Sequence, residues 1–121
     1  MNGAAAAAFV AAWRSGDAAG MAAALDPDAV LVCDTGGVVD GPLDPVNGAG
    51  AIARWMLARF APTRHRLRPT VANTRPAVLV ESAGVLVGTV VMRPDEDRLT
   101  MLWLTLNPEK LRASPPDASG R

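Results

Sequence analysis

The chain of 121 residues has a single cysteine, a single histidine and no tyrosine. One cysteine, Cys33, excludes an internal disulfide, and its place in an apolar run is typical of a small buried side chain rather than a nucleophile. No group of histidine or cysteine has the spacing of metal ligands. We therefore expect neither a metal nor a cofactor. The length suffices for one domain with one core.

The chain also lacks an excess of either charge, since 12 Lys and Arg balance 12 Asp and Glu. Nucleic-acid binding requires a positive surface that displaces counterions, so we expect no nucleic-acid partner. No apolar run is as long as a membrane span. The alanine-rich start lacks the positive region and leucine-rich core of a signal peptide. We expect a cytoplasmic protein without a membrane partner, and the richness in Ala, Gly, Pro and Arg suggests a bacterial genome of high G+C content.

Helical periodicity dominates the first half of the chain. Alanine is the best helix former, and Phe9 and Trp13 belong to an apolar stripe with helical spacing. Asp17 is a suitable N-cap for a second helix and Asn47 for a third. The pattern predicts helices at residues 4–15, 18–25 and 49–60, a strand at 29–34, and a loop at 35–48 with a short strand at Val38-Val39.

The pattern changes to period two after Pro62. Two Val-rich runs joined at Ala83-Gly84 indicate a hairpin. Strands are predicted at residues 65–74, 77–82, 85–92 and 98–106. Helices followed by antiparallel strands form an α+β arrangement, here three N-terminal helices packed on a curved, mostly antiparallel sheet. We expect one domain over residues 1–112 and a disordered tail over 113–121.

A curved sheet wrapped by helices leaves a conical cavity that can bind a small molecule. Aromatic side chains at helical or strand spacing are also typical of an ordinary core or interface. The side chains predicted to line the pocket are Phe9, Trp13, Val32, Trp55, Asn73, Leu102 and Leu104.

Both faces of the last predicted strand are apolar. One face covers the cavity, and the other needs a cover that a second copy of the chain would provide, so we expect a homodimer. The two stripes are Leu102, Leu104 and Leu106 on one face and Leu99, Met101 and Trp103 on the other.

Asp34 ends an apolar run and shares a strand face with Val30 and Val32. If that face is a core, the carboxylate is costly unless it is paired or used, so we predict that Asp34 is a catalytic general base. The alternative is an Asx-turn, in which Asp34 accepts backbone N–H bonds from the Thr-Gly-Gly that follows.

His65 shares a predicted strand face with Asn73 and is predicted as the catalytic partner of Asp34, because histidine suits proton transfer. The alternative is a partly solvated side chain at a strand entrance. Arg64, Arg66 and Arg68 recur on the opposite face. They form either a solvated edge or a docking patch for an acidic partner.

This order of elements resembles the cone-shaped fold of the nuclear-transport-factor-like superfamily, also described as cystatin-like. That superfamily includes ketosteroid isomerase, limonene epoxide hydrolase and the SnoaL-like polyketide cyclases. The stretches that carry the likeness are Trp13-Arg14-Ser15-Gly16-Asp17, Asp26-Pro27-Asp28-Ala29-Val30, Val46-Asn47-Gly48-Ala49 and the paired strands at the end.

A closer resemblance is to the SnoaL-like domain at the C-terminus of a group of extracytoplasmic-function sigma factors, with their Asp-Gly-Gly-Gly turn and Asn-Pro-Asp-Lys-Leu close. Thr35 and Glu109 are mild departures from these signatures. No sigma-factor helices precede the domain, and the Met1 start favours a free-standing relative over a fragment. The matching stretches are Asp34-Thr35-Gly36-Gly37, Asn73-Thr74-Arg75-Pro76-Ala77 and Asn107-Pro108-Glu109-Lys110-Leu111.

The resemblance implies two functions. The first is a cofactor-independent isomerase or cyclase of secondary metabolism that acts on a small apolar or polyketide-like molecule, since Asp34 matches the base of ketosteroid isomerase. Phe9 stands where that enzyme has its oxyanion-hole tyrosine, so steroid isomerisation itself is not expected. The epoxide-hydrolase pattern is weak, because only Asp34 and Glu81 can supply its two carboxylates. The second function is a non-catalytic, ligand-sensing or regulatory domain with a partner in the transcription machinery.

Overall fold

The computed structural model describes residues 3–35 and 44–106. The predicted strand Val38-Val39 and the predicted tail, 113–121, lie outside the described residues. The helices are α1 (Gly3–Arg14), α2 (Ala18–Ala23) and α3 (Ala49–Arg59), and the strands are β1 (Leu25–Asp34), β2 (Val46–Asn47), β3 (Arg66–Ala72), β4 (Arg75–Ser82), β5 (Val85–Asp95) and β6 (Arg98–Thr105).

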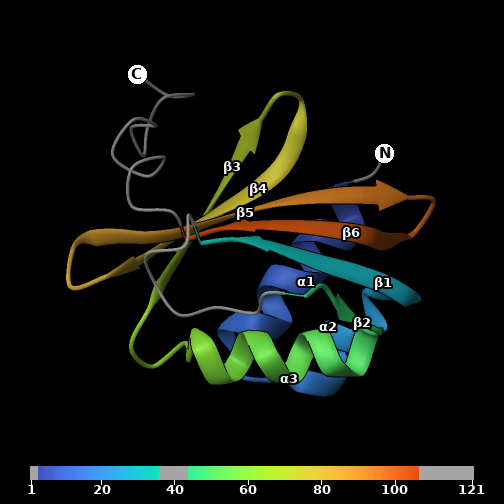
Figure 1. Cartoon of the computed structure of the whole chain (residues 1–121), viewed down its shortest axis with the longest axis horizontal. Helices are drawn as coiled ribbons and strands as arrows, with labels where there is room; N and C mark the ends of the chain where they lie inside the picture. Colours follow the sequence, from blue (N-terminus) through green and yellow to red (C-terminus); the bar gives the residue numbers. More distant parts are fainter. Residues whose placement is uncertain (1–2, 36–43, 107–121) are drawn as a thin grey trace.

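The six strands form one sheet in the order β2-β1-β6-β5-β4-β3. Strands β1 and β6 pair in parallel, and the other neighbouring strands of the described sheet pair antiparallel. Figure 1 shows the three helices gathered on one side of β1, β5 and β6, while β3 and β4 cross these strands steeply. This is the predicted α+β fold, with three helices on a curved, mostly antiparallel sheet. Within the described residues, no helix is long and apolar enough to cross a membrane.

Side-chain alternation gives the sheet two different faces. Leu31 pairs with Leu102, and both are fully buried against the helices. One residue further on, Val32 pairs with Trp103, and Trp103 pairs with Val91. These three side chains are only half-buried and do not belong to the main core. We call the side of Leu31 and Leu102 the inner face and the side of Val32 and Trp103 the outer face.

The helix starts illustrate how local chemistry sets the boundaries. Asp17 caps α2 as predicted, because its Oδ1 accepts the Gly20 N–H at 3.0 Å. The prediction that Asn47 caps α3 is wrong. Asn47 lies in β2 opposite Val30, and the N-cap position is Gly48 with φ +101° and no side-chain bond. That backbone conformation favours glycine, which explains the residue at this corner.

Strand β1 starts four residues earlier than the predicted strand, at Leu25 instead of Ala29. Leu25 pairs with Leu99, and the register with β6 shifts before Val30. Pro27 lies inside this shift. Proline has no N–H to donate to the hydrogen bonds of a regular sheet, but it is tolerated at such irregular positions. Strand β1 therefore continues past Pro27, although proline usually ends a strand.

Candidate functional site

The space between the helices and the inner face is filled by the chain's own side chains. Phe9 and Trp13 are fully buried, with ring centroids 5.9 Å apart. The Trp13 indole N–H donates to the Phe60 carbonyl at 3.0 Å. Leu102 and Leu104, also predicted to line a pocket, are buried in this same cluster. The structure therefore places these four residues in the packed core.

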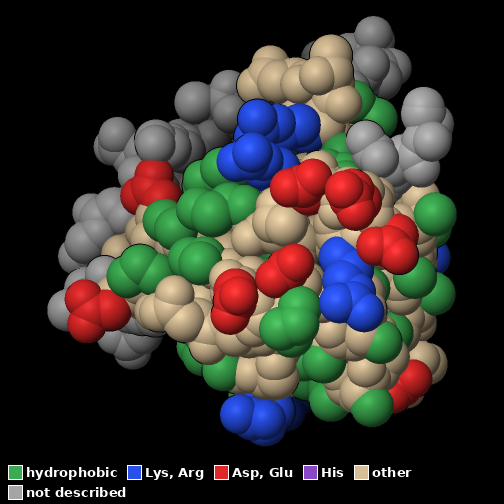
Figure 2. Space-filling view, turned by 90° about the vertical axis from the view of Figure 1, so that its right-hand side faces the viewer, with side chains coloured by type: hydrophobic (Ala, Val, Ile, Leu, Met, Phe, Trp, Pro, Cys, Tyr) green, Lys and Arg blue, Asp and Glu red, His purple; other side chains and the backbone are tan. Residues whose placement is uncertain are grey.

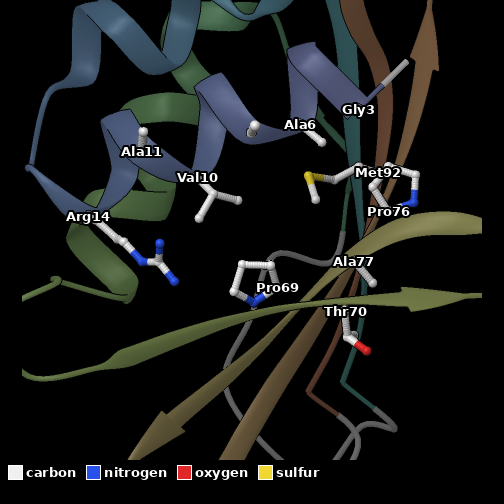
Figure 3. A pocket seen from close by; sticks show the side chains of 11 residues that line it. Gly3, Ala6, Val10, Ala11, Arg14, Pro69, Thr70, Pro76, Ala77 and Met92 are labelled. Atoms are coloured by element: carbon white, nitrogen blue, oxygen red, sulfur yellow. The ribbon is translucent and has the colours of Figure 1, made fainter. Parts of the chain in front are cut away.

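A cavity of about 280 Å³ remains between α1 and the β3–β4 hairpin. Figure 3 shows Val10 pointing from α1 toward Pro69 of β3, with Met92 at the far side. Alanines dominate the side of α1 over this hairpin, and a methyl group does not reach the strands. The lining residues are Gly3, Ala6, Ala7, Val10, Ala11, Arg14, Pro69, Thr70, Pro76, Ala77 and Met92. We call this cavity the α1 pocket.

The lining of the α1 pocket is almost wholly apolar. Among the described residues that line it, only Arg14 and Thr70 have polar side chains, and only Arg14 is charged. Arg14 Nη2 donates to the Leu67 carbonyl at 2.7 Å, which links the end of α1 to β3. The arrangement suits an apolar molecule that also carries a group able to bind a guanidinium.

Asp34 lies on the outer face, at the end of β1. It pairs with Thr105, next to the Val32–Trp103 pair, and it is half-buried. Its backbone carbonyl accepts the Leu106 N–H at 2.7 Å. Asp34 is not among the described residues that line the α1 pocket. The inner face at this level belongs to its neighbour Cys33, which packs against the core.

The environment of Cys33 disfavours the thiolate. Burial raises the pKa of the thiol, and the negative charge of Asp34 raises it further, while the Arg59 guanidinium opposes both effects. A raised pKa keeps the sulfur protonated and unreactive near neutral pH. The structure thus agrees with the interpretation of Cys33 as a small apolar side chain.

His65 lies in a different hollow, of about 330 Å³, together with Arg64, Arg66 and Glu81. Its Nδ1 donates to the Ala61 carbonyl at 3.0 Å, since a carbonyl oxygen can only accept. Its ring meets Phe60 edge-to-face at 5.4 Å. Asp34 is not among the described lining residues of this hollow, so the structure does not bring the two predicted catalytic residues into one described pocket.

The remaining predicted lining residues are scattered. Val32 is on the outer face, and Trp55 packs half-buried against the core with its ring 6.3 Å from Phe60. Asn73 is exposed in the turn from β3 to β4, with φ +52°, a conformation that asparagine tolerates better than most residues. In the described residues, no three His, Cys, Asp or Glu side chains are grouped to hold a metal ion.

Strands β3 and β4 are also tied by an ion pair. Arg68 Nη2 lies 2.8 Å from Glu81 Oε2. Of the three arginines that recur in this segment, Arg68 is therefore paired, whereas Arg64 and Arg66 are exposed.

The fold and the pocket together define a helix-wrapped, curved-sheet domain of the cone type. The model of the SnoaL-like domain family matches residues 6–105, so the chain belongs to that family. No curated protein matches the sequence.

Three solved structures illustrate the likeness in fold. The extracytoplasmic function sigma factor SigJ of Mycobacterium tuberculosis has 18% identity and a TM-score of 0.70, over 94% of this chain and 45% of that one. The chain thus spans less than half of that sigma factor. TerC, co-crystallised with polyporic acid, has 21% identity and a TM-score of 0.64, over 93% of this chain and 95% of TerC. A candidate polyketide cyclase from Sinorhizobium meliloti has 20% identity and a TM-score of 0.59, over 83% and 92% of the two chains.

Proposed function

We propose that this SnoaL-like domain binds a small, mainly apolar molecule in the α1 pocket and acts as a ligand-sensing module. The observation that carries the proposal is the apolar cavity itself, which persists where the rest of the inner face is filled. Its described lining offers neither a carboxylate nor an imidazole as a general base, which favours binding over catalysis. The co-crystallisation of TerC with polyporic acid supports a ligand of this general kind.

Blocking the α1 pocket tests the proposal. Val10→Phe adds a ring to the cavity, whereas Ala8→Phe adds the same ring to an exposed position of α1 that does not line it. A ligand that binds only the folded state raises the melting temperature with its concentration. Naphthalene derivatives should raise the melting temperature of the wild type and of Ala8→Phe, but not that of Val10→Phe. Equal shifts in all three proteins would show that binding occurs elsewhere, and no shift in any would count against the pocket.

A second candidate is a cofactor-independent isomerase or cyclase with Asp34 as general base and His65 as its partner. The observation that favours it is the half-buried position of Asp34 beside the apolar Val32 and Trp103, together with the fold shared with a candidate polyketide cyclase. Asp34→Asn should then abolish turnover of the true substrate, while Asp28→Asn, at an exposed site of the same strand, should leave it intact. Equal turnover in both variants would remove this candidate.

The genetic context separates the two candidates. A neighbouring sigma-factor gene, or recovery of a polymerase component with the tagged protein, would support a regulatory partner. A biosynthetic gene cluster would support the enzyme. The proposed cytoplasmic location rests on the sequence, in which a lone cysteine excludes an internal disulfide.

A homodimer is also part of this proposal. It is supported by the apolar side chains of the outer face, of which Val32, Met101 and Trp103 are only half-buried in the single chain. Such a face is suited to pack against its own copy about a two-fold axis.

A further inference from the structure

We infer that the molecule bound in the α1 pocket carries a single carboxylate or a comparable compact oxyanion, which Arg14 binds. The inference rests on the proposed function, because it names the ligand class of the same pocket. It starts from the placement of Arg14 in the last turn of α1, at one end of a cavity whose other described lining residues carry no charge.

The guanidinium of Arg14 is turned toward the cavity. Figure 3 shows it extending from α1 into the space that Val10 and Pro69 border. Its Nη2 donates to the Leu67 carbonyl at 2.7 Å, which fixes the orientation of the planar group. A guanidinium has five N–H donors, so this bond leaves others for a ligand.

Arg14 has no carboxylate partner within the described part of the chain, where the one ion pair joins Arg68 to Glu81. An arginine that is already oriented and has no protein counter-ion can receive a ligand oxyanion without first breaking an ion pair. Charge-assisted bonds to a carboxylate are about twice as strong as neutral ones, and the planar fork favours two parallel bonds.

The volume limits the apolar part of the ligand. A dry cavity of about 150 Å³ holds benzene, and the α1 pocket measures about 280 Å³. We therefore expect an apolar body of about two fused rings. A second charge directed toward the buried Val10 or Met92 would have no partner there, which is unfavourable. The expected class is thus a bicyclic or similarly sized monocarboxylate.

A matched pair of probes tests the charge without any mutation. Naphthalene-2-carboxylate and naphthalene-2-carboxamide have the same rings and differ in charge. Isothermal titration of the wild type should show about tenfold tighter binding of the carboxylate, the ratio expected for a hydrogen bond to a charged group. Equal affinities would overturn the role of Arg14 and leave the pocket intact. Binding of neither probe would overturn the proposed function.

Variants then assign the preference to Arg14. Arg14→Met should remove the preference for the carboxylate while the carboxamide keeps its affinity, and Arg14→Lys should retain part of the preference because it keeps the charge. Arg64→Met removes an exposed arginine outside the pocket and should change neither affinity. If circular dichroism shows that Arg14→Met is unfolded, the Arg14→Lys variant and the comparison of the two probes on the wild type still test the inference. A preference that survives in folded Arg14→Met would contradict the inference.

Discussion

The indole N–H of Trp13 donates to the carbonyl of Phe60 at 3.0 Å, and this bond joins α1 to the residue that ends α3. Trp13 is part of the core. Its side chain is in contact with neither solvent nor the α1 pocket. The bond satisfies the indole N–H and the carbonyl inside the core, where water cannot replace either partner.

We expect Trp13→Phe to lower the free energy of unfolding by about 2–4 kcal/mol, because it leaves the Phe60 carbonyl without its donor and opens a cavity. Urea denaturation measures the change. Trp55→Phe is the matched control, since Trp55 is only half-buried, and it should cost less. A smaller loss at Trp13 than at Trp55 would show that the bond contributes little.

Stability should fall at alkaline pH because of Cys33. Its pKa is raised in the folded chain, so the unfolded thiol loses its proton first. The stabilisation is therefore complete below the unfolded pKa and is lost as pH rises through the folded pKa. The chain has no tyrosine and only one lysine, so few other side chains titrate between about pH 8 and 10. Urea unfolding across this range should show a decline that Cys33→Ala reduces; an unchanged slope would contradict the assignment.

The Arg68–Glu81 ion pair should couple β3 to β4 weakly. The two side chains are 35% and 16% exposed, so solvent screens their attraction. A double-mutant cycle with Arg68→Met and Glu81→Gln should give a coupling of about 0.5–1 kcal/mol at low salt. The coupling should decrease in 1 M salt, where the screening length is about 3 Å. A coupling that does not depend on salt would indicate a packing effect instead.

The outer face should mediate self-association. Trp103 is half-buried there, with the Arg75 guanidinium 4.9 Å from its ring centroid. Light scattering coupled to gel filtration should give the mass of a dimer for the wild type and of a monomer for Trp103→Ala, because the substitution removes the large aromatic side chain of this face. Arg64→Asp, an exposed substitution elsewhere, should remain dimeric. A monomeric wild type would rule out this interface.

One face of the molecule is rich in acidic side chains. Figure 2 shows acidic side chains predominating among the charged groups on the face turned toward the viewer. Asp95 at the end of β5, and Glu96 and Asp97 in the turn to β6, are all exposed. A face of this sign does not suit a nucleic-acid backbone, in line with the balanced charge of the whole chain.

Local patterns in the sequence predict most of the fold. The alanine-rich first helix, the Asp17 cap and the Ala83-Gly84 hairpin are all present, and both hairpin residues have positive φ. These features depend on residues that are neighbours in the sequence, so they can be predicted from the sequence directly. The prediction that Asn47 caps α3 is wrong, because the pairing of Asn47 with Val30 is a long-range contact.

The candidate site was harder to predict for the same reason. Alternation shows that Asp34 and Val32 share a face, but which face the helices cover depends on tertiary packing. The α1 pocket depends on side chains that are too short to fill a space, such as Ala6 and Ala7. In the sequence, these alanines indicate helix propensity. Nothing in the local pattern indicates an empty volume beside them.

The parallel pairing of β1 with β6 has a consequence for biosynthesis. Leu31 can pair with Leu102 only after almost the entire described chain has been synthesised. A nascent chain that ends before β6 holds β1 beside the two-residue β2 alone, with an apolar edge open to other chains. A chain truncated before Arg98 is therefore expected to leave this edge unpaired and to aggregate rather than to keep part of its function.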